Sequence, residues 1–261
     1  MNDRQVCTGA CLLGKCPFKT CIKYKQGGAH RPLKADMSIL TDGRLPEIPT
    51  GRSGYGAAID IGTTTLALYL YDMGPGKCVR VQSALNPQTS FGLDVISRIK
   101  YCRDNANGTA ELQAAIIGSL NEQLEKLCGG QGISPADLIA LSVTGNTTML
   151  HLLAGVDPSP MGEFPFTVPD MFGRRVSAAS LGLNAGGEVY LERCMAAFVG
   201  GDITSAILSS GMMKDVVSLL LDIGTNGEVA LHAHGQLFVS STAAGPAFEG
   251  SELLCGMAAV T

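Results

Sequence analysis

The sequence lacks three features that mark common classes of protein. It has no excess of positive charge, because 19 lysines and arginines stand against 23 aspartates and glutamates in 261 residues, and a nucleic-acid-binding surface needs a basic stripe. It has no apolar run of the ~20 residues that a membrane span requires. Its first residues lead into cysteines rather than into the apolar core of a signal peptide. We therefore expect no nucleic-acid partner, no membrane span and no secretion.

Apolar residues and glycine are abundant instead. Apolar residues make up 46% of the chain and charged residues only 16%, a balance that is typical of a folded rather than a disordered protein. The 33 glycines are nearly twice the usual share of ~7%. We expect many tight turns and places where backbone approaches a ligand closely.

The chain divides into four segments by composition. Residues 1–29 carry four closely spaced cysteines, and residues 30–55 are rich in proline and glycine, which predicts a linker. Apolar periodicity begins at residue 56. We expect a first α/β domain over residues 56–215 and the start of a second over 216–261.

The periodicity predicts strands and helices in both domains. Helical spacing of leucines ends at a glycine pair, and short apolar runs end at tight polar turns. The segment 157–187 is rich in proline and glycine and is expected to be an irregular insertion. The predicted strands cover 57–61, 66–71, 77–85, 138–143, 196–199, 216–223 and 228–231, and the predicted helices cover 112–127, 149–154 and 202–213.

One tetrapeptide, Asp-Ile-Gly-Thr, occurs at residues 60–63 and again at 222–225, each time between two strands. Such a duplication indicates a repeated hairpin. The aspartate at a strand end can hold Mg²⁺ through water, the glycine lets backbone approach a phosphate, and the residues after it offer N–H and hydroxyl donors. Two such hairpins facing across a cleft can clasp a triphosphate, although either copy alone is also compatible with a simple polar turn. The predicted site comprises Asp60, Gly62, Thr63, Thr64, Thr65, Asp222, Gly224, Thr225, Asn226 and Gly227.

These hairpins resemble the two phosphate motifs of the superfamily of actin, sugar kinases and heat-shock chaperone ATPases. The resemblance implies ribonuclease-H-like α/β domains with ATP and Mg²⁺ between them, and we expect the second domain to be truncated at Thr261. A Gly-Gly-Asp sequence at 200–202 is similar to the one that supplies the catalytic base in carbohydrate kinases of the superfamily. It makes Asp202 the candidate base, together with Asp60 and Asp222 as catalytic residues. The alternative role of Asp202, which does not exclude the first, is the N-cap of a helix.

Three longer stretches, 84–99, 144–151 and 241–250, resemble a narrower group, the ATP-dependent reductive activators of corrinoid proteins. The resemblance implies that ATP helps to return cob(II)alamin of a corrinoid protein to cob(I)alamin with electrons from a low-potential donor. Gly245 and Glu249 in the third stretch are candidate contacts to nucleotide or Mg²⁺, and a carboxylate at a helix N-terminus is the alternative for Glu249.

The four clustered cysteines are candidate metal ligands. Four thiolates at intervals of three, four and four residues suit a [4Fe–4S] cluster or a structural Zn²⁺ ion, and two disulfides or no ligand are the alternatives. The resemblance favours iron–sulfur, because such activators receive low-potential electrons, and with it a cytoplasmic, oxygen-poor location. The candidate ligands are Cys7, Cys11, Cys16 and Cys21.

Two other functions fit the same motifs. A small-molecule kinase would use Asp202 to deprotonate a substrate hydroxyl, and a nucleotide or metal sensor would bind without catalysis. Among the polar residues outside the motifs, Asn146 is expected to contact phosphate or to bridge the domains, with helix capping as the alternative. His151 is expected to be a core histidine, with a corrinoid-facing role as the alternative, whereas His232 and His234 are expected to face solvent.

Overall fold

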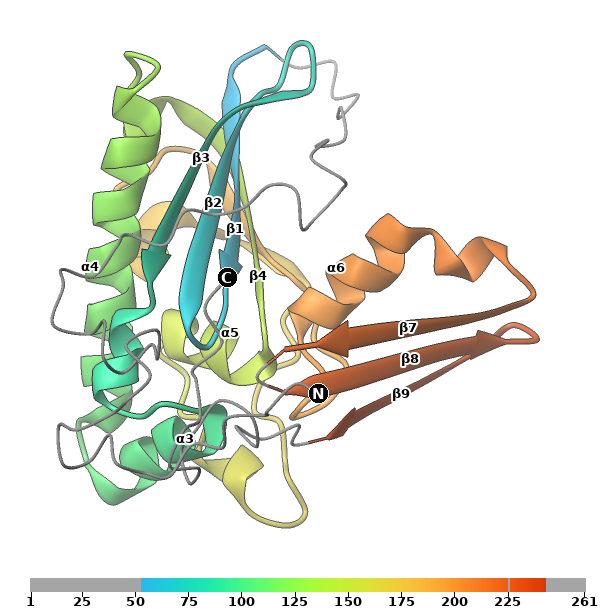
Figure 1. Ribbon diagram of the computed structural model, residues 1–261. Helices are drawn as coiled ribbons and strands as arrows, with labels where there is room; N and C mark the ends of the chain where they lie inside the picture. The colour runs from blue at the N-terminus through green and yellow to red at the C-terminus, as the bar shows by residue number, and fades with distance from the viewer. Residues whose placement is uncertain (1–52, 225, 243–261) are drawn as a thin grey trace, which may run out of the picture.

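The computed structural model describes residues 53–224 and 226–242 as two β-sheets flanked by helices (Figure 1). The first sheet has six strands in the order β3-β2-β1-β4-β6-β5 and the second has three, in the order β7-β8-β9. The first six strands are β1 (Tyr55–Ile61), β2 (Thr65–Asp72), β3 (Lys77–Leu85), β4 (Leu138–Gly145), β5 (Arg174–Ser177) and β6 (Glu188–Leu191). The other three are β7 (Val217–Ile223), β8 (Gly227–Ala233) and β9 (Gln236–Thr242).

Among the described residues, four α-helices and five short 3-10 helices lie between the strands. The α-helices are α3 (Val95–Asp104), α4 (Gly108–Gly129), α5 (Thr147–Ala154) and α6 (Gly201–Ser210). The 3-10 helices are η2 (Pro87–Ser90), η3 (Pro135–Asp137), η4 (Ser159–Gly162), η5 (Ala178–Leu181) and η6 (Met212–Lys214). In the part of the chain that is described, no helix is both long and apolar enough to cross a bilayer.

The first sheet begins as an antiparallel meander and continues with parallel strands. β1 pairs antiparallel with β2, β2 pairs antiparallel with β3, and β1 and β4 then pair in parallel. A parallel pair requires a crossover, and the long helix α4 lies in the connection between β3 and β4. This mixed arrangement confirms the predicted α/β class.

The main core lies between the first sheet and α4 (Figure 1). The leucine periodicity correctly predicted the buried face of α4, since all of its members are fully buried: Leu112, Ile116, Leu120, Leu124 and Leu127. They pack into one core with Ile59 and Ile61 of β1. Because side chains alternate along a strand, Asp60 between these isoleucines lies on the opposite face of the sheet.

The second sheet projects from that opposite side, with α6 packed on one of its faces (Figure 1). Ile203 and Ile207 of α6 form a second core with Ala230 of β8. The other face carries exposed apolar side chains, among them Leu219 at 59% and Phe238 at 54% exposure. None of the residues that the structure describes covers that face.

Three sequence predictions about elements are wrong. The strand predicted over 196–199 is only an isolated bridge between Ala196 and Val199, because Val199 packs with α6. Strand β6, for which no strand was predicted, pairs in parallel with β4. The insertion 157–187 contains β5, which pairs antiparallel with β6. Helix α6 ends at Ser210 because Gly211 has a left-handed φ of 68°.

Candidate functional site

The first Asp-Ile-Gly-Thr segment forms the tight turn between β1 and β2. The amide of Gly62 donates to the carbonyl oxygen of Thr65 over 2.9 Å. A Cβ atom at position 62 would lie 2.7 Å from that same oxygen, so only glycine fits here without moving the backbone. The turn places Thr63 and Thr64 at the closed end of the hairpin, next to the end of β4.

Asn146 connects this turn to the start of α5. Its Oδ1 accepts from the amide of Met149 over 3.0 Å, which confirms the helix-capping role. Its Nδ2 donates to Oγ1 of Thr63 over 3.0 Å. The Thr63 oxygen therefore acts as acceptor, and its hydroxyl hydrogen remains to donate to a ligand.

Asp202 lies in the first turn of α6, and it is not the N-cap. Gly200 occupies the N-cap position, without a side-chain cap, because a Cβ atom there would lie 2.5 Å from Cα of Asn146. This close approach brings the beginning of α6 against the Asn146 turn. The Asp202 carboxylate accepts from the amide of Ile203 over 2.8 Å. The N-cap alternative is therefore wrong, and the side chain is available for another role.

The three predicted aspartates come together between the sheets, and a glutamate joins them. Burial, followed by the negative charges of Asp202 and Asp222, raises the pKa of Asp60 to about 7. Burial likewise raises the pKa of Asp202 to about 6, with a contribution from Asp222. Burial, followed by the charges of Asp202 and Asp222, raises the pKa of Glu228 to about 7. The pairing of β7 with β8 sets Glu228 directly opposite Asp222.

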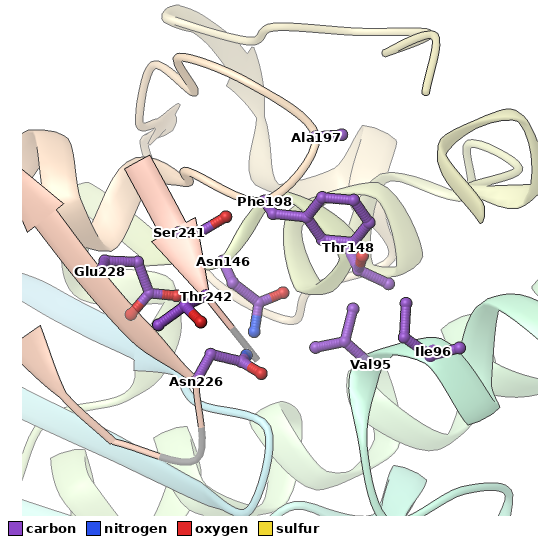
Figure 2. Close-up of a pocket in the computed structure, with 10 residues that line it drawn as sticks. All are labelled: Val95, Ile96, Asn146, Thr148, Ala197, Phe198, Asn226, Glu228, Ser241 and Thr242. Carbon is purple, nitrogen blue, oxygen red and sulfur yellow. The ribbon is translucent and has the colours of Figure 1, made fainter. Parts of the chain in front are cut away.

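A cavity of about 220 Å³ lies beside these carboxylates, between the two parts of the structure (Figure 2). One wall comes from α3, the start of α5 and Phe198, and the other comes from β8, β9 and the β7–β8 turn. The amides of Asn146 and Asn226 face it from opposite walls (Figure 2). The hydroxyl of Thr148, buried in the wall, has no hydrogen-bond partner, so a polar group of a ligand would satisfy it. The lining residues are Val95, Ile96, Asn146, Thr148, Ala197, Phe198, Asn226, Glu228, Ser241 and Thr242.

The second hairpin is only partly described. The amide of Gly224 donates to the carbonyl oxygen of Asn226 over 3.0 Å, and Gly227 pairs with Ile223 at the start of β8. The remaining predicted site residues, which are Thr225, Gly245, Glu249, Cys7, Cys11, Cys16 and Cys21, lie outside the described residues, as does most of the predicted linker.

Two of the three histidine predictions are confirmed and one is wrong. His151 is fully buried, its Nε2 accepts from the amide of Asp170 over 3.2 Å, and its Nδ1 lies 2.7 Å from the carbonyl oxygen of Thr147. Both ring nitrogens are engaged within the protein, and burial lowers the pKa of His151, which confirms a core histidine. His234 is exposed as expected. His232 was expected to face solvent but is only 6% exposed, because it lies on the face of β8 that α6 covers.

Four side chains around the first turn and the cavity had no predicted role. They are Asn86, Arg98, Thr148 and Glu228. Hairpin symmetry was a usable signal for Glu228, because a turn centred on residue 225 places 228 opposite 222. The local sequence contains no signal that Arg98 is buried.

Replacing Asp60 with asparagine is expected to stabilise the fold at pH 8 more than at pH 5. The pKa of Asp60 is about 7 in the fold against an ordinary value of 3.8. As pH rises between these values, the unfolded chain releases a proton that the folded chain keeps, so the free energy of unfolding falls. Asparagine removes this loss. Urea midpoints at both pH values measure it, with exposed Asp215→Asn as the control, and an equal change at both pH values would contradict the shift.

Two family models together match residues 55–261. The model of the RACo middle region matches residues 55–215, and the model of the C-terminal domain of RACo, the ASKHA domain, matches residues 216–261. The chain belongs to the RACo family. The ASKHA description and the mixed sheets confirm the predicted actin-like ATPase class for this RACo chain.

Three relatives illustrate the family. The corrinoid activation enzyme RamQ of Eubacterium limosum is 37% identical over 210 residues, covering 79% of this chain and 35% of RamQ. The Co(II) methylated amine-specific corrinoid protein reductase of Methanosarcina barkeri is 24% identical over 217 residues, 78% of this chain and 39% of the reductase. A solved reductive activator for corrinoid, iron-sulfur protein superposes with a TM-score of 0.72 at 40% identity, over 77% of this chain and 32% of the activator. This RACo chain thus spans between 32% and 39% of each relative's length.

Proposed function

We propose that this chain binds the phosphates of ATP between its two Asp-Ile-Gly-Thr hairpins and acts in the ATP-dependent reductive activation of a corrinoid protein. The observation that carries the proposal is the convergence of Asp60, Asp202 and Asp222, from β1, α6 and β7, on one site. The names of the relatives supply the chemistry, since one is a corrinoid activation enzyme and another a reductase of a Co(II) corrinoid protein.

The roles within the site follow from position and charge. The Gly62 turn offers N–H and hydroxyl donors to phosphate oxygens on one side, and Asn226 approaches from the other. Asp202 orients and deprotonates the water that attacks the terminal phosphate. With a pKa of about 6, this carboxylate is ionised at neutral pH and still basic enough to accept a proton.

The carboxylates suit a hydrated Mg²⁺. The pKa values of Asp60 and Glu228 are raised first by burial and then by the negative charges of Asp202 and Asp222, and a divalent cation would offset those charges. Within the described ranges, no three His, Cys, Asp or Glu side chains are placed to bind one metal ion directly. Asp60 and Asp222 would therefore hold Mg²⁺ through water while phosphate oxygens ligate it, which neutralises charge as the terminal phosphate leaves.

The redox half of the proposal rests on the sequence and on the relatives. One electron passes from a reduced low-potential donor to the corrinoid, so that Co(II) becomes Co(I) while the donor is oxidised by one electron. ATP and water become ADP and phosphate, and the domains change their relative angle. The four clustered cysteines would hold a [4Fe–4S] cluster, or else Zn²⁺; iron, sulfide and zinc contents of protein purified without oxygen distinguish the two.

An anaerobic corrinoid assay tests the function. A methylated-amine corrinoid protein in the Co(II) state is mixed with the chain, a one-electron reductant of low potential and Mg-ATP, and the visible spectrum is followed. Co(I) is expected to form only when chain and ATP are both present, with release of free phosphate. Formation of Co(I) that is indifferent to ATP would contradict reductive activation. Phosphate transferred to a small-molecule hydroxyl would instead establish the kinase alternative.

A further inference from the structure

A buried guanidinium lies directly behind the first phosphate turn. Arg98 of α3 is 0% exposed, although buried arginines are normally paired with carboxylates. None of the ion pairs among the described residues includes it. Burial lowers the pKa of Arg98 to about 10, and the charge of Asp94 at the start of α3 only partly opposes this. Burying a cation without a carboxylate partner costs free energy, so we ask what this charge does in the protein.

The contacts of Arg98 are to backbone and neutral groups. Its Nε donates to the carbonyl oxygen of Gly92 over 2.9 Å, and its Nη2 donates to the carbonyl oxygen of Thr63. Its Nη1 lies 3.3 Å from Oε1 of Gln88 and 3.0 Å from the sulfur of Met149. The positive charge therefore stays available to the anion that the neighbouring turn would bind.

Arg98 is one of the groups that fix every carbonyl of this turn. Asn86 donates through Nδ2 to the carbonyl oxygen of Gly62 and through its backbone amide to that of Thr64, each over 2.8 Å. Arg98 donates to the carbonyl oxygen of Thr63, which lies between these two residues in the sequence. Each of the three carbonyl oxygens of the turn thus accepts a hydrogen bond from a buried side chain or its backbone.

Fixing the carbonyls also orients the amides. In a trans peptide the N–H points away from the preceding carbonyl, so the amides of Thr63 and Thr64 point away from Asn86 and Arg98. The Thr63 hydroxyl is likewise left as a donor by Asn146, which lines the cavity. The backbone of the turn therefore presents amide donors on the side away from the buried cation, and the Thr63 hydroxyl adds a further donor.

We propose that Arg98 is the positioning residue of the first phosphate turn, and that its charge makes the turn prefer polyphosphate anions of high charge over singly phosphorylated ligands. This inference rests on the proposed function, because it assigns the turn to phosphate. Without Arg98, the Thr63 carbonyl loses its donor, the turn can rotate an acceptor toward the ligand, and the electrostatic preference disappears.

Binding of inorganic tripolyphosphate and of orthophosphate, each with Mg²⁺, tests the assignment by calorimetry. Arg98→Met is expected to weaken tripolyphosphate binding by about tenfold or more and orthophosphate binding by less. Arg98→Lys, which keeps the charge without the guanidinium fork, is expected to retain much of the preference for tripolyphosphate but to bind both anions more weakly than wild type. Lys100→Met is the matched control, because it removes an exposed cation from the same helix, and it is expected to bind as wild type does.

The outcomes separate this inference from the proposed function. Circular dichroism melts establish that each variant is folded, and if Arg98→Met is not, Arg98→Lys carries the comparison. Folded Arg98 variants that keep wild-type affinity and wild-type preference would overturn the role of Arg98 while leaving the phosphate site intact. Failure of wild type and Lys100→Met to bind either anion would remove the phosphate site itself, and this inference with it.

Discussion

Asp202→Asn is expected to lower ATP hydrolysis by about 10²–10⁴-fold, which is the usual contribution of a general base. The amide oxygen of asparagine can still accept from the Ile203 amide, as the carboxylate does over 2.8 Å, so the first turn of α6 is preserved. It cannot accept the proton of the attacking water. ATP affinity is not expected to weaken, because the substitution removes a negative charge from a site that binds an anion.

Phosphate release and equilibrium binding of ATP, measured on the same preparations, separate these effects. In wild type the rate is expected to rise with pH through about 6, as Asp202 loses its proton. Asp215→Asn is the control, because Asp215 is exposed and takes no part in the carboxylate cluster. Hydrolysis that persists in Asp202→Asn would show that another group is the base, and unchanged behaviour throughout would favour a nucleotide sensor.

Gly62→Ala is expected to weaken Mg-ATP binding by at least about a hundredfold. The new Cβ atom would lie 2.7 Å from the carbonyl oxygen of Thr65, a backbone atom that cannot rotate away. The turn must open, and the donors of Thr63 and Thr64 then leave the phosphate. Two hydrogen bonds to a charged group, at about 1.5–3 kcal/mol each, account for the loss.

Gly118→Ala is the matched control for Gly62→Ala. Gly118 lies on the exposed side of α4, where a Cβ atom would meet nothing within 4 Å. Alanine there is expected to stabilise the helix by about 0.5–1 kcal/mol and to leave ATP binding unchanged. Titration calorimetry of both variants gives the comparison. Wild-type affinity in Gly62→Ala would contradict the role of the turn in holding phosphate.

The features that the sequence could predict are local ones. The buried face of α4 follows from leucines three and four residues apart, and the two hairpins follow from apolar runs broken at a tight turn. The duplicated tetrapeptide correctly indicated that Asp60 and Asp222 lie near one another, since their charges interact in the structure. A repeated motif allows this prediction, because two copies of one hairpin that face each other across a cleft place their aspartates at equivalent positions on its two sides.

The features that the sequence could not predict depend on distant partners. Whether the basic residue Arg98 is exposed or buried depends on the carbonyl of Thr63, 35 positions earlier in the chain. Local composition does not predict β6 as a strand, because it has only four residues and follows a glycine pair. The apolar run 196–199 has the composition of a strand but forms only an isolated bridge. Val199 packs against α6 instead of joining the sheet, and this tertiary contact is not visible in the local sequence.

Hydrogen–deuterium exchange with and without Mg-ATP tests the central claim most directly. If nucleotide phosphates are bound between the two hairpins, amide protection is expected at residues 62–65 of the first turn and at residues 224–228 of the second, in the same titration and with the same midpoint. Residues 108–129 of α4, on the far side of the first sheet, are expected to show no change. Protection confined to one turn, or found only elsewhere in the chain, would contradict an ATP site between the hairpins.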